Sequence, residues 1–187
     1  MPVEIWDARR YTPEQVRSIG ALVNQVWPKP NMNAADRAAQ LLALRDQYAD
    51  ATDSWPRSLV IVEEGRVVAH AALLPRTIGT ALGELSIAGL ARVCTSAAVR
   101  GRGLGEQVTR AALGLIDAGE FDYALFQTNR RVQGFYEKLG AVLVKNPIVN
   151  SLGADPNANP FWDEIVMRYP SDEDWPGGTI DLRGPGY

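Results

Sequence analysis

A glycine-rich turn is the feature that most limits what this chain can fold into. A long apolar stretch and an amphipathic stretch meet at Val93-Cys94-Thr95-Ser96-Ala97-Ala98-Val99-Arg100-Gly101-Arg102-Gly103-Leu104-Gly105. We therefore expect a strand that passes through a turn of alternating glycines into a helix. Such a turn exposes backbone N–H groups beside the positive end of the helix dipole. This chemistry favours an anion, in particular a phosphate or pyrophosphate group.

Known phosphate-binding motifs narrow the choice of ligand. The dinucleotide motif G-x-G-x-x-G is longer than the spacing here, and no early βαβ unit surrounds these glycines. The Walker pattern is absent, because no Gly-Lys-Ser/Thr follows the turn. The pattern present is R-x-x-G-x-G, from Arg100 to Gly105. Taken alone, the glycines also allow a plain strand-to-helix turn that binds nothing.

The spacing of apolar residues predicts an α/β fold with the element order β-α-α-β-β-β-α-β-α-β-β. The expected strands cover residues 3–6, 58–63, 66–75, 85–95, 123–127, 141–144 and 164–168. The expected helices start after Thr12, after Asn33 and after the glycine turn, and the last one covers 131–139. Thr12 and Gln15 form a capping-box pattern. We expect a single domain over residues 1–187, with a mixed central sheet flanked by helices. The segment 145–160 gives no clear prediction, and the tail from Pro170 is expected to be extended.

Composition excludes several classes of function. The formal net charge of −3 argues against a nucleic-acid partner, which needs a basic surface. Cys94 and His70 are the single cysteine and the single histidine, so we expect no disulfide within the chain and no metal centre. No apolar run approaches the ~20 residues of a membrane span, and the start lacks the pattern of a signal peptide. We therefore expect a cytoplasmic protein without a membrane partner.

A second motif follows the glycine turn. It reads Asn129-Arg130-Arg131-Val132-Gln133-Gly134-Phe135-Tyr136-Glu137-Lys138-Leu139-Gly140-Ala141. With both motifs in this order, the chain resembles the GNAT superfamily of N-acetyltransferases. R-x-x-G-x-G resembles the acyl-CoA pyrophosphate motif of that superfamily, and the second stretch resembles its other cofactor motif. The resemblance covers roughly residues 58–145 as a cofactor core, and residues 161–187 form the C-terminal strand and tail.

The resemblance implies a fold, a reaction and a cofactor site. Acetyl-CoA would give its acetyl group directly to a primary amine of a small molecule. The main chain of one strand would bind the pantetheine arm as an added strand does. The turn would hold the pyrophosphate, and one asparagine would contact the cofactor as well. These expected cofactor-binding residues are Val93, Cys94, Thr95, Arg100, Gly101, Arg102, Gly103, Leu104, Gly105 and Asn129.

The resemblance also implies the catalytic groups. Tyr136 matches the general acid, and a phenol with a pKa near 10 carries its proton at neutral pH. The acceptor amine must lose a proton, so a base or a chain of waters is needed. Many members place a glutamate where this chain has Ala91. Glu84, at the start of the strand, and a water relay are therefore the two candidates for this role.

Cys94 and His70 have alternative interpretations. A thiol on the cofactor strand would allow a covalent intermediate, but direct transfer needs none. We therefore expect Cys94 to be packed and inert. We expect His70 to be a strand histidine with a satisfied hydrogen bond.

Two shorter resemblances concern the acceptor. The segment from Val68 to Arg76 is similar to a hairpin of aminoglycoside 2′-N-acetyltransferases, and the tail from Trp175 is similar to that group and to NodA-type N-acyltransferases. Both groups acylate amino sugars, so an amino sugar is one predicted acceptor, and a generic amine or amino acid derivative is the other. Trp27 and acidic residues are expected to bind it. The acidic candidates are Asp163, Asp172, Glu173, Asp174 and Asp181.

Other functions stay open at this point. The chain could bind acyl-CoA as a sensory module without catalysis, which the alanine at position 91 favours and the presence of Tyr136 argues against. It could also acetylate a peptide or a protein. A homodimer is an arrangement that the resemblance allows.

Overall fold

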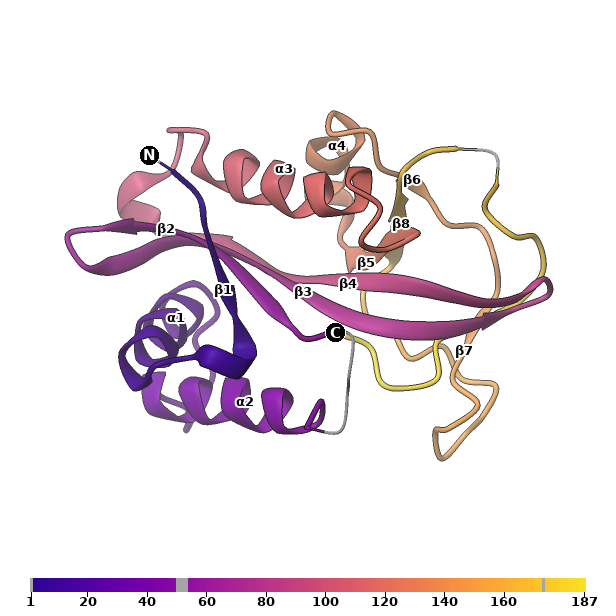
Figure 1. Ribbon diagram of the computed structural model, residues 1–187, viewed down its shortest axis with the longest axis horizontal. Coiled ribbons are helices and arrows are strands. Elements are labelled where there is room, and N and C mark those ends of the chain that lie inside the picture. Colours follow the sequence, from indigo (N-terminus) through magenta and orange to yellow (C-terminus); the bar gives the residue numbers. More distant parts are fainter. Residues whose placement is uncertain (1, 50–53, 173) are drawn as a thin grey trace. The chain divides into compact units, whose positions relative to one another are not determined.

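The computed structural model describes residues 2–49, 54–172 and 174–187 (Figure 1). The chain forms two compact units. Unit 1 contains Met1–Leu74 and Ala91–Ala112, and unit 2 contains Pro75–Leu90 and Leu113–Tyr187. The two longest strands, β3 (Arg66–Thr80) and β4 (Gly83–Thr95), contribute residues to both units.

Unit 1 is a layer of strands covered by two helices. The strand order is β1-β2-β3-β4, and β2 pairs antiparallel with both β1 and β3. Its remaining elements are β1 (Glu4–Asp7), the 3-10 helix η1 (Ala8–Arg10), α1 (Pro13–Val26), α2 (Ala34–Asp46), β2 (Arg57–Glu63), the 3-10 helix η2 (Ala97–Val99) and the first part of α3 (Leu104–Asp117). Both covering helices lie on the same side of these strands (Figure 1).

The starts of the two covering helices are fixed by their own side chains. Thr12 accepts a hydrogen bond from the backbone N–H of Gln15, and the Gln15 side chain accepts one from Thr12 in return. This is the predicted capping box. Asn33 and Asp36 form a second one at α2. Each cap satisfies N–H groups that have no partner inside the helix, which is worth about 1 kcal/mol.

The core of unit 1 lies between α1, α2 and the strands. Fully burying an aliphatic side chain stabilises a fold by about 1.5–3 kcal/mol, so this cluster holds the helix pair on the sheet. Its buried members are Val16, Ile19, Leu22, Val23, Ala38, Leu41, Val60, Val67 and Cys94.

Unit 2 continues the sheet in the order β3-β4-β5-β8-β6. β4 pairs parallel with β5 over Ile87 to Gly89, while β5 and β8 are antiparallel. The two-residue strands β7 (Ile148–Val149) and β9 (Ile180–Asp181) pair with each other, and β9 also pairs with β3 at Gly79. The further elements are β5 (Tyr123–Thr128), α4 (Arg130–Glu137), β6 (Val142–Leu143), β7 (Ile148–Val149), β8 (Ile165–Tyr169) and β9 (Ile180–Asp181).

The tail of the chain packs onto unit 2 through Tyr187. Its ring lies over Gly89, where an added Cβ would stand 2.5 Å from a ring carbon. Its hydroxyl donates to the Leu125 carbonyl at 2.9 Å, and the Arg76 guanidinium lies 5.0 Å from the ring centre. Gly89 therefore leaves the space that the tyrosine occupies.

The predicted fold class is confirmed: the protein is α/β, with helices against a mixed sheet. Each predicted strand and helix is present, with ends displaced by a few residues. The main differences are β7 and β9, which lie in the segment without a prediction and in the tail expected to be extended. β3 also runs on to Thr80, past the proline at position 75.

We expect Gly20→Ala to lower the free energy of unfolding by about 1–3 kcal/mol. A Cβ at Gly20 would stand 2.6 Å from the Ala34 carbonyl oxygen, so α1 and α2 would have to move apart. Gly114→Ala is the matched control, because a Cβ there meets nothing within 4 Å in α3. That variant should gain up to about 1 kcal/mol from helix propensity. Urea unfolding measures both, and equal effects would contradict the close contact.

Candidate active site

The glycine turn has the backbone of an anion-binding loop. Gly101 and Gly103 have φ angles of +80° and +74°, which other residues adopt only with strain. A Cβ at either position would meet nothing within 4 Å, so the backbone is open there. The Gly103 carbonyl accepts the Gln107 N–H at 3.0 Å and starts α3. The first N–H groups of α3 have no acceptor inside the helix and suit an anion.

The last glycine of the motif has a different role. A Cβ at Gly105 would stand 3.0 Å from Thr95 Oγ1, at the end of β4. Gly105 therefore lets the first turn of α3 approach the strand closely. This contact fixes the position of the helix N-terminus relative to the end of β4.

The two arginines of the turn differ in their surroundings. Arg102 forms a two-point ion pair with Glu63, with N–O distances of 2.8 and 3.2 Å. Arg100 is exposed and has no ion pair within the described part of the chain. Arg100 is thus the arginine whose charge is not already balanced by a carboxylate.

Cys94 is packed, as predicted. Its side chain is 5% exposed and belongs to the core under α1 and α2. Burial raises the pKa of the Cys94 thiol to about 12, so it carries its proton at neutral pH. Side chains alternate along a strand, so Val93 and Thr95 lie on the opposite face of β4. A buried, protonated thiol is a poor nucleophile, which favours the packed, inert interpretation of Cys94.

His70 is fully buried and forms two hydrogen bonds, as predicted for a strand histidine. Its Nδ1 donates to the Arg92 carbonyl at 2.9 Å, because a carbonyl can only accept. Nε2 then accepts from the Ser58 hydroxyl at 2.9 Å, and that hydroxyl accepts from Tyr11 at 2.7 Å. Burial lowers the pKa of His70 to about 4, so the ring is neutral.

Arg92 is a residue that the sequence analysis did not single out. Its φ is +50°, which is unusual for an arginine in the middle of a strand. Its Nη1 is buried without a hydrogen-bond partner among the described residues. The signal in the sequence is a lone charge inside the apolar stretch from Leu85 to Cys94, but a single charge does not reveal which neighbours surround it.

In unit 2, the second motif forms the start and the body of α4. Asn129 is the N-cap, and its side chain accepts the Val132 N–H at 3.2 Å. Tyr136 is 7% exposed, and its ring packs against Phe126 and Phe135 with ring centres 4.6 and 4.9 Å away. The side-chain oxygen of Asn129 thus already serves the helix, while Tyr136 is held firmly in place.

The other predicted site residues have local partners. Glu84 forms an ion pair with Arg183 at 2.5 Å, which raises the pKa of Arg183. Burial raises the pKa of Asp181, but hydrogen bonds from Ser151 and Arg183 outweigh it and hold that pKa below its usual value. Glu84 and Asp181 therefore both have their charges compensated.

The remaining candidates for binding the acceptor include Asp163 in unit 2 and Trp27 in unit 1. The backbone N–H of Asp163 donates to the Gln127 side chain at 2.9 Å in unit 2. Trp27 ends α1 in unit 1 and is 42% exposed. Glu173 lies outside the described residues.

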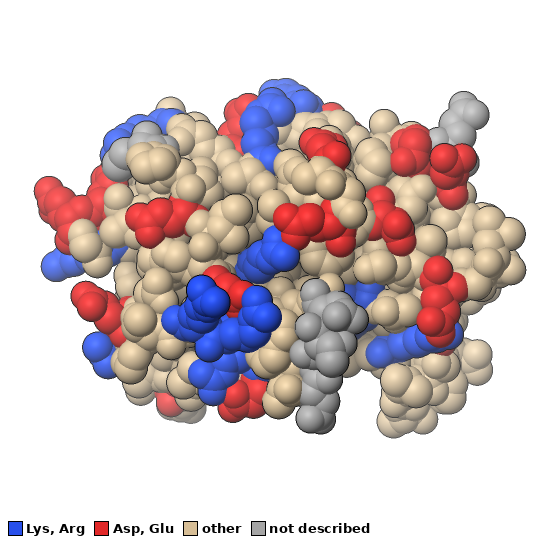
Figure 2. All heavy atoms as spheres, viewed as in Figure 1, with Lys and Arg blue, Asp and Glu red and all other residues tan. Residues whose placement is uncertain are grey.

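Charges of both signs occupy the surface. Lys and Arg side chains are interspersed with Asp and Glu side chains on the face that Figure 2 shows. Across residues 2–49, 54–172 and 174–187, no helix combines the length and the apolar character needed to cross a membrane.

Comparison with known proteins identifies relatives. A family model described as "Acetyltransferase (GNAT) domain" matches residues 7–143. No curated protein matches the chain.

Several solved structures share the fold. An acyl-CoA N-acyltransferase from Pseudomonas aeruginosa is 20% identical and has a TM-score of 0.59, with 89% of this chain and 97% of that chain covered. A GNAT family N-acetyltransferase from Escherichia coli, solved with CoA, is 15% identical with a TM-score of 0.61, covering 96% and 89%. An acetyltransferase of the same family from Brucella melitensis, solved with acetyl-CoA, is 16% identical with a TM-score of 0.58, covering 96% and 95%. At these identities the likeness is one of fold.

We expect the stability of the protein to fall as the pH drops from about 6.5 to about 4. The pKa of His70 is 6.5 in an open chain and about 4 in the folded protein. The unfolded state therefore binds more protons in this window, which removes up to about 3 kcal/mol. Urea unfolding at several pH values measures the slope. His70→Gln should flatten it, and an unchanged slope would assign the pH dependence to other groups.

Proposed function

Because the chain belongs to the GNAT acetyltransferase family, we propose that it transfers an acetyl group from acetyl-CoA to a primary amine of a small molecule. The observation that carries the proposal is the open turn at Gly101 and Gly103 ahead of α3. Two structural neighbours, solved with CoA and with acetyl-CoA, support this choice of donor. A sensory module without catalysis would keep the same turn, so turnover separates the two functions.

The glycine turn is suited to the pyrophosphate group of acetyl-CoA, the acetyl donor. Backbone N–H groups from Gly101 to Gly105 can donate hydrogen bonds to the phosphate oxygens. The absence of Cβ atoms at Gly101 and Gly103 leaves room for the phosphates. Arg100 adds a charge that has no ion pair among the described residues, whereas Arg102 is already paired with Glu63. The main chain of β4 from Val93 to Thr95 pairs with the pantetheine arm in the manner of an added strand.

The chemistry divides between an acid and a base. The amine nitrogen forms a C–N bond with the acetyl carbon, and the C–S bond breaks with its electrons on sulfur. Tyr136 donates a proton to that sulfur, and a phenol is protonated at neutral pH. The proton of the amine passes to Glu84 or to a chain of waters. Glu84 would first have to leave its ion pair with Arg183.

The acceptor is a small amine, and an amino sugar is one class that the sequence suggests. For that class, Trp27 offers a partly exposed ring, and Asp163 and Asp181 offer carboxylates. The carboxylate of Asp181 already accepts hydrogen bonds from Ser151, so Asp163 is the better candidate of the two.

Gly103→Asp should abolish donor binding, since it places a side chain and a negative charge where the pyrophosphate would lie. Thermal unfolding measures this: acetyl-CoA and CoA should stabilise the wild type, and NAD should not. Gly119→Asp is the matched control, because Gly119 also has a positive φ of +77° and open space around it. Equal stabilisation of both variants by CoA would place the donor elsewhere.

Tyr136→Phe should slow acetyl transfer by about 10²–10⁴-fold, the usual contribution of an acid–base group, and leave CoA affinity nearly unchanged. The variant keeps the ring that packs against Phe126 and Phe135, so the fold should be retained. Release of CoA in the presence of an amine panel gives the rate. Full activity in this variant would remove Tyr136 from the mechanism.

A further inference from the structure

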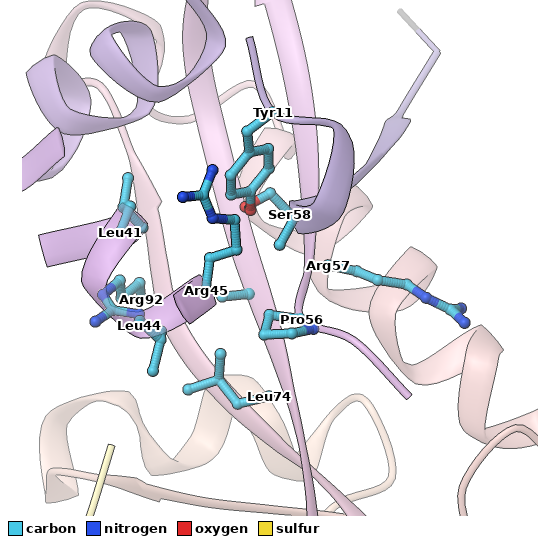
Figure 3. A pocket seen from close by; sticks show the side chains of 11 residues that line it. Tyr11, Leu41, Leu44, Arg45, Pro56, Arg57, Ser58, Leu74 and Arg92 are labelled. Carbon is cyan, nitrogen blue, oxygen red and sulfur yellow. The ribbon is translucent and has the colours of Figure 1, made fainter. Parts of the chain in front are cut away.

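A small cavity in unit 1 is lined by arginines. It measures about 10 Å³ and lies between α2, η1 and the strands β2, β3 and β4 (Figure 3). Figure 3 shows Tyr11 beside Ser58 at this cavity, together with apolar side chains such as Leu41 and Leu74. None of the described residues that line it is acidic, while three are arginines: Arg45, Arg57 and Arg92.

Arg92 carries a charge that the described part of the protein leaves uncompensated. Its Nη1 is buried and has no hydrogen-bond partner there. Burial lowers the pKa of Arg92, Tyr11 offsets this in part, and repulsion from Arg37 lowers it further. Buried charges in proteins are normally paired, because an unpaired one costs several kcal/mol.

The guanidinium of Arg37 also has one buried nitrogen without a hydrogen-bond partner among the described residues. Arg37, on α2, is 8% exposed, and its Nε is also buried without a partner. Its Nη2 donates to the Trp27 carbonyl at 2.6 Å and its Nη1 donates to the Gln40 side chain at 3.4 Å, but neither acceptor carries a negative charge. In contrast, Arg45 is paired with Asp46 at 2.6 Å. Among the described residues, the uncompensated charge at this cavity is therefore that of Arg92. The nearby charge of Arg37 adds to the positive potential there.

The size of the cavity indicates what could balance this charge. A volume of about 10 Å³ admits roughly one water-sized atom, so a single oxygen of a carboxylate fits there and the bulk of a phosphate does not. A guanidinium N–H forms a strong, charge-assisted hydrogen bond with one carboxylate oxygen, so Nη1 of Arg92 could hold a carboxylate through that single oxygen. Arg92 directly precedes Val93, where the main chain proposed to bind the donor begins.

We propose that Arg92 binds a carboxylate of the acceptor, so that the acceptor is an amino acid or a similar amine bearing a carboxylate. This inference rests on the proposed acetyltransferase function. It also favours one of the two predicted acceptor classes, because an aminoglycoside is a polycation and the charge of Arg92 would repel it.

Matched substrate pairs test the proposal. CoA release is measured with amino acids and with their carboxamides, which differ in the carboxylate. The wild type should prefer the carboxylates, and Arg92→Gln should lower kcat/KM for them by about 10- to 100-fold, the worth of a charged hydrogen bond. The carboxamides should change little. Arg17→Gln is the control, because Arg17 is exposed on α1 and does not line this cavity.

A binding measurement keeps the proposal testable if no amine is acetylated. Formate, the smallest carboxylate, is compared with chloride and phosphate by thermal unfolding of the wild type and Arg92→Gln. A stabilisation by formate that Arg92→Gln loses would support the carboxylate site even if the proposed function fails. Equal shifts with all three ions in both proteins, or equal use of amino acids and carboxamides, would overturn it. One more result would overturn the proposal: Arg92→Gln is less stable than the wild type without added ions, yet formate stabilises both proteins equally.

Discussion

The hydrogen bond between the buried His70 ring and the Arg92 carbonyl ties β3 to β4 inside unit 1. A positive φ at Arg92 costs about 1–3 kcal/mol, so the backbone of β4 keeps this conformation only because the surrounding residues hold it. The neutral ring of His70 does so from β3, with Ser58 and Tyr11 completing the chain of hydrogen bonds. The Arg92 side chain lines the same cavity as Leu41, Leu44 and Arg45 of α2.

Glycines serve two different physical needs in this molecule. At Gly101 and Gly103 the need is conformational, because the turn requires positive φ and leaves its backbone uncovered. At Gly20 and Gly105 the need is space, since a neighbouring element lies where a side chain would be. Only the first kind exposes N–H groups to a ligand. The same residue type therefore indicates a binding site in one place and close packing in another.

Local patterns in the sequence predicted much of this structure. The strand, turn and helix around Gly103, the cap at Thr12 and the buried His70 all depend on residues close together in the chain or on an apolar context. The pairing of Glu84 with Arg183 depends on residues that are far apart in sequence, so no spacing could predict it. β7 and β9 are too short for any periodicity. The buried charge of Arg92 appears only when α2 and β4 are placed together.

The ion pair between Arg102 and Glu63 has a consequence for how the turn attracts an anion. Two charges that cancel at short range produce little field beyond a Debye length of about 8 Å in physiological salt. Of the two arginines in the turn, Arg100 therefore contributes more to the long-range steering of an incoming anion. At the proposed donor site, recognition would then rely on short-range contact with N–H groups of fixed direction, so capture should respond more to ligand shape than to ionic strength.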